Sequence, residues 1–294
     1  MEIKKKKALF VINPISGGKS KDSVGKLIDR HIDNEHFDVE LVFTEREHHA
    51  TELTRQAIKN NKDYIIAVGG DGTINEVAQA LIGTDKTLGV LPLGSGNGLA
   101  RHLKIPLRAD RAIKLINKQH TVRIDTCMVN NQPFLCTSGV GFDAYVSALF
   151  AQSGSRGFST YVKSTLKAFF NFQPEDYYIK TDEHEMEMKA FSVTFANASQ
   201  YGNDAYIAPQ ANIKDGLLDV CLLAPFPKWQ MPSVGLGLFT KSLPKMPYYQ
   251  SFRTKKVVLE RKKAGASHLD GENFTFGERL EVAIKPKSLN ILSA

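Results

Sequence analysis

The sequence of 294 residues lacks the features that would place the protein in a membrane or in an oxidising compartment. It has three cysteines, Cys127, Cys136 and Cys221, an odd number without the spacing of a metal site, which argues against a disulfide framework and favours a reducing environment. No apolar run approaches the roughly 18 residues that a membrane-spanning helix needs. The basic start is followed by an apolar stretch that ends after five residues at Asn13, too short for the core of a secretory signal. We therefore expect a cytoplasmic protein with a β-strand near its start.

Acidic residues are outnumbered, and the excess of positive charge lies in one segment. The chain has 38 Lys and Arg against 31 Asp and Glu, a formal net charge of +7. Residues 241–263 alone hold eight basic residues and one acid, a net +7 in 23 residues, so the other 271 residues carry 30 of each sign and are neutral. A chain that is basic throughout favours nucleic acid as a partner, and this distribution does not. We expect no nucleic-acid binding.

Hydrophobic residues make up 42% and charged residues 23%, as in folded soluble proteins, and the length predicts about two domains. In the first part of the chain, short apolar runs alternate with helical patterns. Such alternation predicts parallel βαβ units, whose ligands gather at the loops that follow the carboxyl ends of the strands. Strands are expected at 8–12, 37–43, 64–68 and 88–91, and helices at 20–32, 50–60, 73–82 and 108–117.

After about residue 122, hairpin signals predict a second, mostly antiparallel domain. Its helices are expected at 143–150 and 161–170. Its strands are expected at 121–129, 134–138, 177–180, 188–195, 217–223, 252–259 and 281–284.

Three loops after predicted strands are rich in small residues. The first, from Asn13 to Ser20, opens a helix and copies only the tail of a P-loop, so an anion site and a simple turn capped by Ser20 are equally good interpretations. The third strand is followed by Gly69-Gly70-Asp71-Gly72-Thr73, where the glycines allow a close approach of phosphate. A carboxylate there suits a metal carried by the phosphates or a proton taken from a hydroxyl group. The fourth strand is followed by Gly94-Ser95-Gly96-Asn97-Gly98, which suits a phosphate or a nucleotide.

Two carboxylates in the second half occupy Asp-Gly sequences. Asp215 precedes a strand, and Glu272 follows Asp270-Gly271. Taken alone, both patterns are typical of turns. Asp215 and neighbouring carbonyl groups would also suit a hard cation.

Five segments together resemble the diacylglycerol kinase catalytic family, which includes bacterial lipid kinases, sphingosine kinases and ceramide kinases. They occur in the family order and extend from residue 13 to residue 272. The matching segments are Asn13-Pro14 with Ser16-Gly17, Gly69 to Glu76, Pro92 to Asn97, Asp215 to Asp219, and Leu269 to Glu272.

The resemblance implies an N-terminal α/β nucleotide-binding domain and a C-terminal antiparallel β-sandwich, with the active site in the cleft between them. The implied boundaries are 1–124, completed by 286–294, and 125–285. The implied reaction transfers the γ-phosphoryl group of ATP, with Mg²⁺, to a lipid hydroxyl group. The variant Ser95-Gly96-Asn97-Gly98 looks more like the sphingosine kinase branch, so the resemblance leaves open a diacylglycerol-like or a sphingoid- or ceramide-like acceptor.

The resemblance also implies roles for individual residues. Glu272 matches the proton acceptor, and Asp71 competes for that role or helps to hold catalytic Mg²⁺. A structural Mg²⁺ ion is implied at Asp215 with the carbonyl groups of Asn212 and Leu217. The residues expected at the nucleotide are Asn13, Pro14, Ile15, Ser16, Gly17, Thr44, Gly69, Gly70, Asp71, Gly72, Thr73, Ile74, Asn75 and Ser95.

Two other functions fit parts of the sequence. An NAD kinase-type enzyme explains Asp71 but not the segment around Glu272, and a non-catalytic nucleotide-binding module has no need of both carboxylates. The basic segment 241–263, with nearby apolar residues such as Trp229 and Phe239, predicts a patch for anionic lipid head groups. A solvated strand face is the alternative. We expect peripheral association with the inner membrane surface, and a homodimer remains open.

Overall fold

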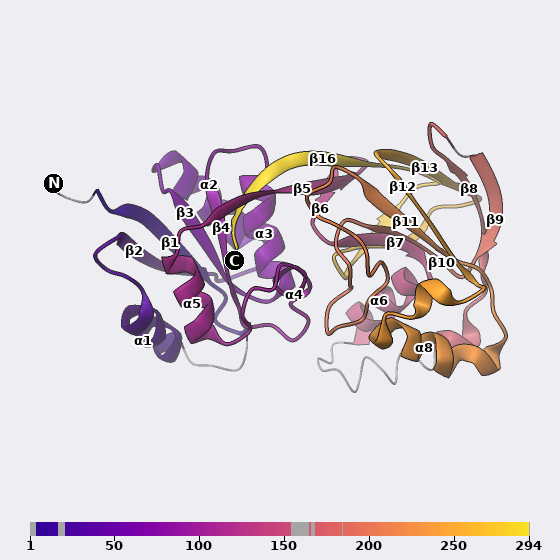
Figure 1. The fold of residues 1–294 in the computed structure, drawn as a ribbon, viewed down its shortest axis with the longest axis horizontal. Coiled ribbons are helices and arrows are strands. Elements are labelled where there is room, and N and C mark those ends of the chain that lie inside the picture. Colours follow the sequence, from indigo (N-terminus) through magenta and orange to yellow (C-terminus); the bar gives the residue numbers. More distant parts are fainter. Residues whose placement is uncertain (1–3, 17–20, 154–164, 166–167, 184, 294) are drawn as a thin grey trace. The chain divides into compact units, whose positions relative to one another are not determined.

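The computed structural model describes residues 4–16, 21–153, 165, 168–183 and 185–293, and the chain forms two compact units (Figure 1). Unit 1 comprises Met1–Ile124 and Lys287–Ala294, and unit 2 comprises Asp125–Pro286. The chain passes between the units within β5 (Thr121–Val129) and again within β16 (Arg279–Leu292).

Unit 1 is built on a parallel sheet with the strand order β2-β1-β3-β4, extended by the end of β16. Strands β3 and β4 are buried at every residue, which explains why they are continuous apolar runs in the sequence. The elements are β1 (Lys6–Ile12), α1 (Lys21–His31), β2 (Phe37–Phe43), α2 (His49–Lys59), β3 (Tyr64–Gly69), α3 (Asp71–Leu81), β4 (Thr87–Pro92), α4 (Gly98–His102) and α5 (Ala109–Asn117).

Helices cover both faces of this sheet. Helix α2 packs against α3, and α1 packs against α5 on the other face (Figure 1). Strand β2 lies on one side of β1 in the sheet, and β3 and β4 lie on the other side. The strand order therefore reverses between β1 and β3, and ligands of such sheets bind outside the carboxyl ends of the strands at this switch point.

Unit 2 contains two antiparallel layers. The first is a six-stranded sheet in the order β12-β11-β10-β7-β14-β15, and the second pairs β16, β13, β8 and β9, with β5 pairing β16 and β6. The elements are β6 (Gln132–Phe134), β7 (Thr137–Gly141), α6 (Phe142–Ser153), β8 (Glu175–Lys180), β9 (Glu185–Ala190), β10 (Ser192–Ala196), β11 (Leu218–Leu223), α8 (Met231–Thr240), β12 (Tyr249–Thr254), β13 (Lys256–Arg261), β14 (Gly265–Leu269) and β15 (Glu272–Phe276), with short 3-10 turns at Lys228–Gln230 and Leu243–Lys245.

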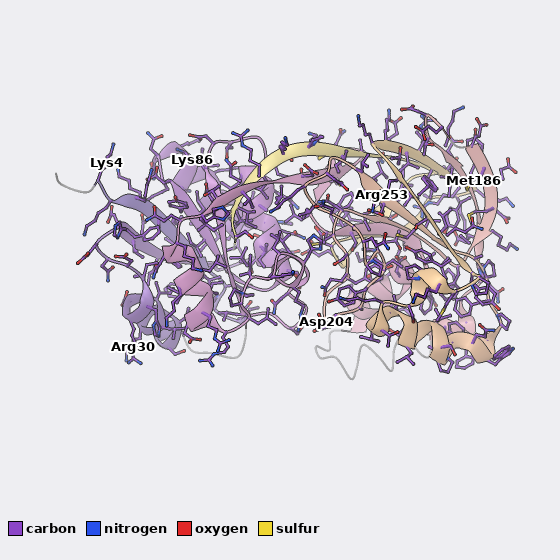
Figure 2. The ribbon with its side chains drawn as sticks, viewed as in Figure 1. Lys4, Arg30, Lys86, Met186, Asp204 and Arg253 are labelled. Atoms are coloured by element: carbon purple, nitrogen blue, oxygen red, sulfur yellow. The ribbon has the colours of Figure 1, made fainter. Side chains whose placement is uncertain are left out.

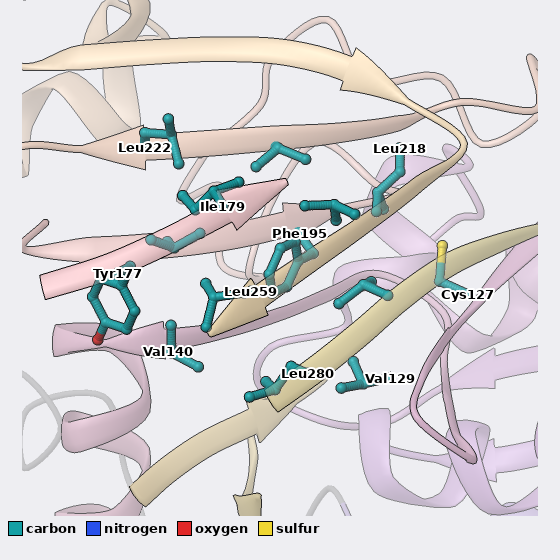
Figure 3. Packing of buried hydrophobic residues seen from close by; sticks show 14 of the residues in the cluster. Cys127, Val129, Val140, Tyr177, Ile179, Phe195, Leu218, Leu222, Leu259 and Leu280 are labelled. Carbon is teal, nitrogen blue, oxygen red and sulfur yellow. The ribbon is translucent and has the colours of Figure 1, made fainter. Parts of the chain in front are cut away.

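The two-residue period of the strands separates the two cores of unit 2. On β11, Leu218, Val220 and Leu222 point into the cluster between the sheets, whereas Cys221 and Leu223 pack in a second cluster with α8. Met186 on β9, labelled in Figure 2, is partly buried against the first cluster. Figure 3 shows side chains of both layers in that cluster, among them Phe195, Leu259 and Leu280.

Four predicted strands were wrong in their bounds, and one of them, 281–284, is only part of the longer β16. The predicted strand 134–138 is divided between β6 and β7, and the predicted strand 188–195 is divided between β9 and β10. The predicted strand 252–259 is divided between β12 and β13, which belong to different sheets. No turn residue marks these changes of direction, so the sequence pattern runs through them.

Two further points concern the helices and the cysteines. The helix predicted at 161–170 lies mostly outside the described residues, and α8 was not predicted. No helix in the described part of the chain has both the length and the apolar composition needed to cross a bilayer. All three cysteines are buried and none forms a disulfide bond, so they pack as small core residues.

Candidate active site

Asn13 directly follows β1 and connects it to β3 at the switch point. Its backbone N–H donates to the carbonyl oxygen of Val68 on β3 at 2.9 Å. Its side-chain Nδ2 donates to the hydroxyl oxygen of Thr73 at 3.1 Å, and its Oδ1 accepts from the Ile15 N–H at 3.1 Å. The loop after β1 is therefore tied to the first turn of α3.

Helix α3 starts at this junction without a side-chain cap. It begins at Asp71 after the extended Gly70, and the N–H of Ile74 makes the first helical bond, to the Gly70 carbonyl oxygen at 3.1 Å. The N–H groups of the first turn and the helix dipole create a positive potential that favours an anion. This is the best candidate phosphate site of unit 1.

Asp71 binds the loop after β4 with both of its carboxylate oxygens. Oδ2 accepts from the Asn97 N–H at 2.8 Å, and Oδ1 accepts from the Gly98 N–H at 2.7 Å. Burial raises the pKa of Asp71 above its usual value, although these hydrogen bonds and the charge of Arg101 act in the opposite direction. The carboxylate thus holds the third loop against the start of α3.

Glycines at this junction serve contacts between the loops. A Cβ on Gly94 would lie 2.5 Å from the Gly70 Cα, and a Cβ on Gly96 would lie 2.6 Å from Oδ2 of Asp71. The Leu93 N–H donates to the Gly69 carbonyl oxygen at 2.8 Å. The sequence suggested that glycines leave space for a phosphate; the structure adds that two of them allow the loops themselves to meet.

The other residues expected at the nucleotide differ in what they present. Thr44 follows β2 and lies beside the first loop, because its N–H donates to the Ile12 carbonyl oxygen at 2.9 Å. Ser95 is exposed, whereas the Ile74 and Asn75 side chains are buried in α3. Pro14 and Ser16 are half-buried, Ile15 is exposed, and Gly17 lies outside the described residues.

Glu76 ends the matching segment Gly69 to Glu76, and it caps a helix. Its carboxylate accepts from the N–H groups of His48 at 3.1 Å and Ala50 at 3.0 Å, at the start of α2. Thr51 donates to the Glu76 carbonyl oxygen at 2.9 Å. The motif therefore fixes α2 to α3 as well as shaping the loop.

In unit 2, Glu272 is the first residue of β15 and is exposed. The turn before it is fixed by Asp270, whose carboxylate accepts from the N–H groups of Leu135 at 2.7 Å, Cys136 at 2.7 Å and Thr137 at 2.9 Å. Asp270 and Gly271 both have positive φ, at 50° and 88°. The sequence analysis quoted Asp270 only as part of a turn, and it missed this anchoring role.

A second polar group of unit 2 has no counterpart in the sequence analysis. Asp143, at the start of α6, accepts from the Thr194 hydroxyl at 2.9 Å and the Tyr201 hydroxyl at 3.1 Å. Its Oδ2 also lies 3.2 Å from His268 Nε2, and His268 is 2% exposed. Burial and the nearby Asp143 charge raise the pKa of Tyr201 well above its usual value, which keeps its hydroxyl group protonated as a donor. This network joins α6 to the strand that precedes the Glu272 turn.

The expected metal loop has oxygen atoms of the kind that Mg²⁺ prefers. Asp215 Oδ1 accepts from the Leu217 N–H at 3.0 Å, and the Asn212 carbonyl oxygen accepts from the Asp215 N–H at 3.3 Å. Asp215 Oδ2 lies 4.0 Å from the Arg253 guanidinium. Within the described residues no three His, Cys, Asp or Glu side chains form a metal-binding group, so an ion here would rely on Asp215 and carbonyl oxygens. The donor set fits Mg²⁺, with Arg253 as a competing positive charge.

Asp71 and Glu272 belong to different units, so their joint action stays a prediction. Within unit 1, the structure brings together Asn13, Thr73 and Asp71 with the loop after β4. Within unit 2, it brings together Asn212, Asp215 and Leu217 in one loop and places Glu272 on a separate hairpin.

The fold and these loops define a protein with an α/β unit suited to phosphate and a β-sandwich unit. The model of the diacylglycerol kinase catalytic domain matches residues 7–129, and that of the YegS C-terminal NAD kinase beta sandwich-like domain matches residues 137–293. The chain belongs to the diacylglycerol kinase and YegS family of lipid kinases.

Two relatives and a solved structure are similar to this chain over most of its length. "Uncharacterized protein sll0036" of Synechocystis is 28% identical and covers 99% of this chain and 71% of its own length. "Probable lipid kinase YegS-like" of Pseudomonas aeruginosa is 29% identical over 82% of this chain and 80% of its own length. A crystal structure described as a diacylglycerol kinase of Bacillus anthracis matches the fold with a TM-score of 0.76 at 20% identity, over 99% of this chain and 98% of that one. The expected fold class, α/β followed by an antiparallel β-sandwich, is confirmed.

Proposed function

We propose that the chain transfers the γ-phosphoryl group of ATP to a hydroxyl group of a lipid. The observation that carries this proposal is the junction of the loops after β1, β3 and β4, which Asn13 and Asp71 hold around the uncapped start of α3. Backbone N–H groups and a helix dipole at such a junction suit the phosphates of ATP. Membership of a kinase family supports the same nucleotide.

Glu272 is the proton acceptor in this proposal, and Asp71 positions the loops. Glu272 is exposed at the end of a turn that three hydrogen bonds to Asp270 hold in place, so its carboxylate can meet a substrate hydroxyl group. Asp71, in contrast, has both oxygens in hydrogen bonds to backbone N–H groups. A positioned general base contributes about 10²- to 10⁴-fold to the rate, and the remaining acceleration comes from alignment and charge neutralisation.

When bound with the nucleotide, Mg²⁺ would neutralise charge on the phosphates. Asp71 is the carboxylate of unit 1 that lies beside the phosphate loops and would contribute to its binding. In unit 2, Asp215 with the carbonyl groups of Asn212 and Leu217 would hold an ion with a structural role, because it would fix the loop before β11.

The proposed acceptor is a diacylglycerol-like or a sphingoid- or ceramide-like lipid, phosphorylated at the cytoplasmic surface of the membrane. The names of relatives, such as "Probable lipid kinase YegS-like", support a lipid rather than a soluble acceptor. An NAD kinase-type reaction is the second candidate, since the model matching residues 137–293 is described as NAD kinase beta sandwich-like.

An acceptor panel distinguishes these functions. Purified protein is incubated with ATP labelled at the γ-phosphate and with diacylglycerol, monoacylglycerol, ceramide, a sphingoid base or NAD. We expect label in one or more lipids. Label only in the dinucleotide would refute the lipid reaction in favour of NAD phosphorylation. No label in any acceptor, together with retained ATP binding, would favour a regulatory module.

A further inference from the structure

Unit 2 exposes a group of large apolar side chains on and beside α8. Trp229 is 76% exposed, Leu236 63%, Phe170 58% and Phe239 49%. The other exposed large apolar side chains in the described part of the chain are Ile15 and Leu107, and both belong to unit 1. An exposed group of large apolar side chains on and beside one helix is typical of an interaction surface.

The segments that carry these side chains pack against an aromatic cluster. Below α8, an aromatic cluster includes Phe169, Phe191 and Phe226, and the Phe169 and Phe226 rings stack with centroids 5.7 Å apart. Lys228 Nζ donates to the Phe170 carbonyl oxygen at 3.2 Å and lies 5.9 Å from the centre of its ring. Phe170 and the segment that leads into α8 therefore form one surface, on the side of the six-stranded sheet where α6 and α8 lie (Figure 1).

The same part of the sequence contains no acid. Residues 220–259 have six basic residues and no Asp or Glu, and residues 144–174 have three basic residues and no Asp or Glu. Lys228, Lys241 and Lys245 flank the exposed side chains, and the described residues give them no carboxylate partner. Lys241 Nζ instead lies 4.3 Å from the centre of the Tyr206 ring. The neighbouring acid is Asp204, labelled in Figure 2, which accepts from the Tyr206 hydroxyl at 3.2 Å.

The second half of the basic segment 241–263 has a different character. Arg261 is 7% exposed and donates to carbonyl oxygens of Gly265, Ala266, Phe276 and Gly277. Ion pairs join Lys256 to Glu281, Lys262 to Asp176, and Arg253 to Asp219. The sequence analysis treated 241–263 as one patch, but much of the charge after residue 250 is paired or buried. The charge available to a partner is therefore concentrated around α8.

We propose that Phe170, Trp229, Leu236 and Phe239, with Lys228, Lys241 and Lys245, form a surface that docks onto an anionic lipid bilayer. We call these residues the α8 surface. The apolar side chains enter the region between the head groups and the acyl chains, and the three lysines contact anionic head groups. The proposal rests on the proposed function in one respect, since a lipid kinase has its acceptor in a membrane. The combination of exposed apolar side chains with lysines that have no carboxylate partner among the described residues favours a bilayer over a protein partner or a second copy of this chain.

Vesicle sedimentation of the full chain tests this proposal. The probes are vesicles of phosphatidylcholine alone and of phosphatidylcholine with about one third phosphatidylglycerol. Reversing Lys228, Lys241 and Lys245 to Glu should weaken binding to the anionic vesicles at least 100-fold, by the energy of basic residues near such a surface. Trp229→Ser with Phe239→Ser should weaken it at least tenfold without changing the net charge. Added salt should weaken binding of the wild type.

A charge-matched control lies in unit 1. Lys59, Lys114 and Lys118 are exposed, and reversing them to Glu changes the net charge by the same amount. This variant should bind anionic vesicles within about threefold of the wild type. Equal loss in the control and in the lysine variant would overturn the proposal, because bulk charge would then explain binding. Wild-type binding by both α8-surface variants would also overturn it. A third outcome would overturn it as well. If the wild type self-associates and the variant with Trp229→Ser and Phe239→Ser does not, the surface binds a second copy of the chain.

A second readout separates this proposal from the proposed function. With a short-chain lipid acceptor in solution, the α8-surface variants should keep the turnover of the wild type, whereas turnover on vesicles should fall with binding. Vesicle binding that depends on the α8 surface, without phosphorylation of any lipid, would refute the function and keep the docking surface. If the rate of lipid phosphorylation on vesicles were the same in the wild type and in the α8-surface variants, the docking surface alone would be refuted. Circular dichroism and melting temperatures confirm that each variant is folded.

Discussion

Asp270 provides the most quantitative prediction of this structure. Its two carboxylate oxygens accept three backbone N–H groups, from Leu135, Cys136 and Thr137, at 2.7 to 2.9 Å. In Asp270→Asn, the amide oxygen can still serve Cys136 and Thr137, which share one oxygen in the wild type. The amide NH₂ group then faces the Leu135 N–H, so one charge-assisted bond is lost and one donor is left unpaired.

The expected cost follows from that geometry. Hydrogen bonds to charged groups contribute about 1.5–3 kcal/mol, so we expect Asp270→Asn to destabilise unit 2 by about 2–3 kcal/mol. For a unit of 162 residues, counted from Asp125 to Pro286, this corresponds to a fall in melting temperature of about 4–12 °C. Because the same turn holds Glu272, turnover should fall as well, while ATP binding should stay unchanged.

Calorimetry and hydrogen exchange measure these effects. The Leu135 amide should exchange faster than in the wild type, which reports the lost bond locally. Asp182→Asn is the matched control, because Asp182 is exposed, and it should stay within about 0.5 kcal/mol of the wild type. If Asp270→Asn had the same melting temperature as the control and the Leu135 amide kept its protection from exchange, the carboxylate would not anchor this turn.

Three further predictions concern single carboxylates. Glu272→Gln should lower turnover by about 10²- to 10⁴-fold with ATP affinity unchanged, and wild-type turnover would exclude it as the proton acceptor. Burial raises the pKa of Asp71 in the folded state above its value of about 4 in the unfolded chain. Protonated Asp71 therefore stabilises the folded state at low pH, and this contribution should be lost as the pH rises above about 4 through the folded-state pKa. The difference in melting temperature between the wild type and Asp71→Asn should therefore depend on pH across this window, and a constant difference would contradict the assignment. Asp215→Asn should abolish any rise in melting temperature on addition of Mg²⁺, measured without nucleotide; an unchanged rise would place the ion elsewhere.

The strands of unit 1 were predictable because helices separate them in the sequence and because β3 and β4 are buried on both faces. Phe37–Phe43 was predicted at its observed bounds, and the predicted runs around β1, β3 and β4 agree within two residues. Strands β3 and β4 are continuous apolar runs, whereas the edge strand β2 alternates apolar and acidic residues before it ends in an apolar run, so each has clear ends in the sequence. The three glycine-rich loops could be placed at one edge of the sheet for the same reason.

Unit 2 was less predictable because tertiary packing decides its details. Strands β12 and β13 are separated only by Lys255 and belong to different sheets, a change that no turn residue marks. Helix α8 contains a proline and two glycines and has weak helix propensity, so it depends on the aromatic cluster beneath it. The contact between Asp143 and His268 joins residues 125 positions apart, which no local pattern can indicate.

The central claim is that this chain transfers phosphate from ATP to a lipid hydroxyl group. The most direct measurement offers the purified wild type ATP labelled at the γ-phosphate, with diacylglycerol, ceramide, a sphingoid base and NAD present together at equal concentration, and separates the products. Our account predicts label in a lipid, Mg²⁺-dependent and lost in Glu272→Gln. Label confined to the dinucleotide, or lipid labelling that Glu272→Gln leaves unchanged, would contradict it.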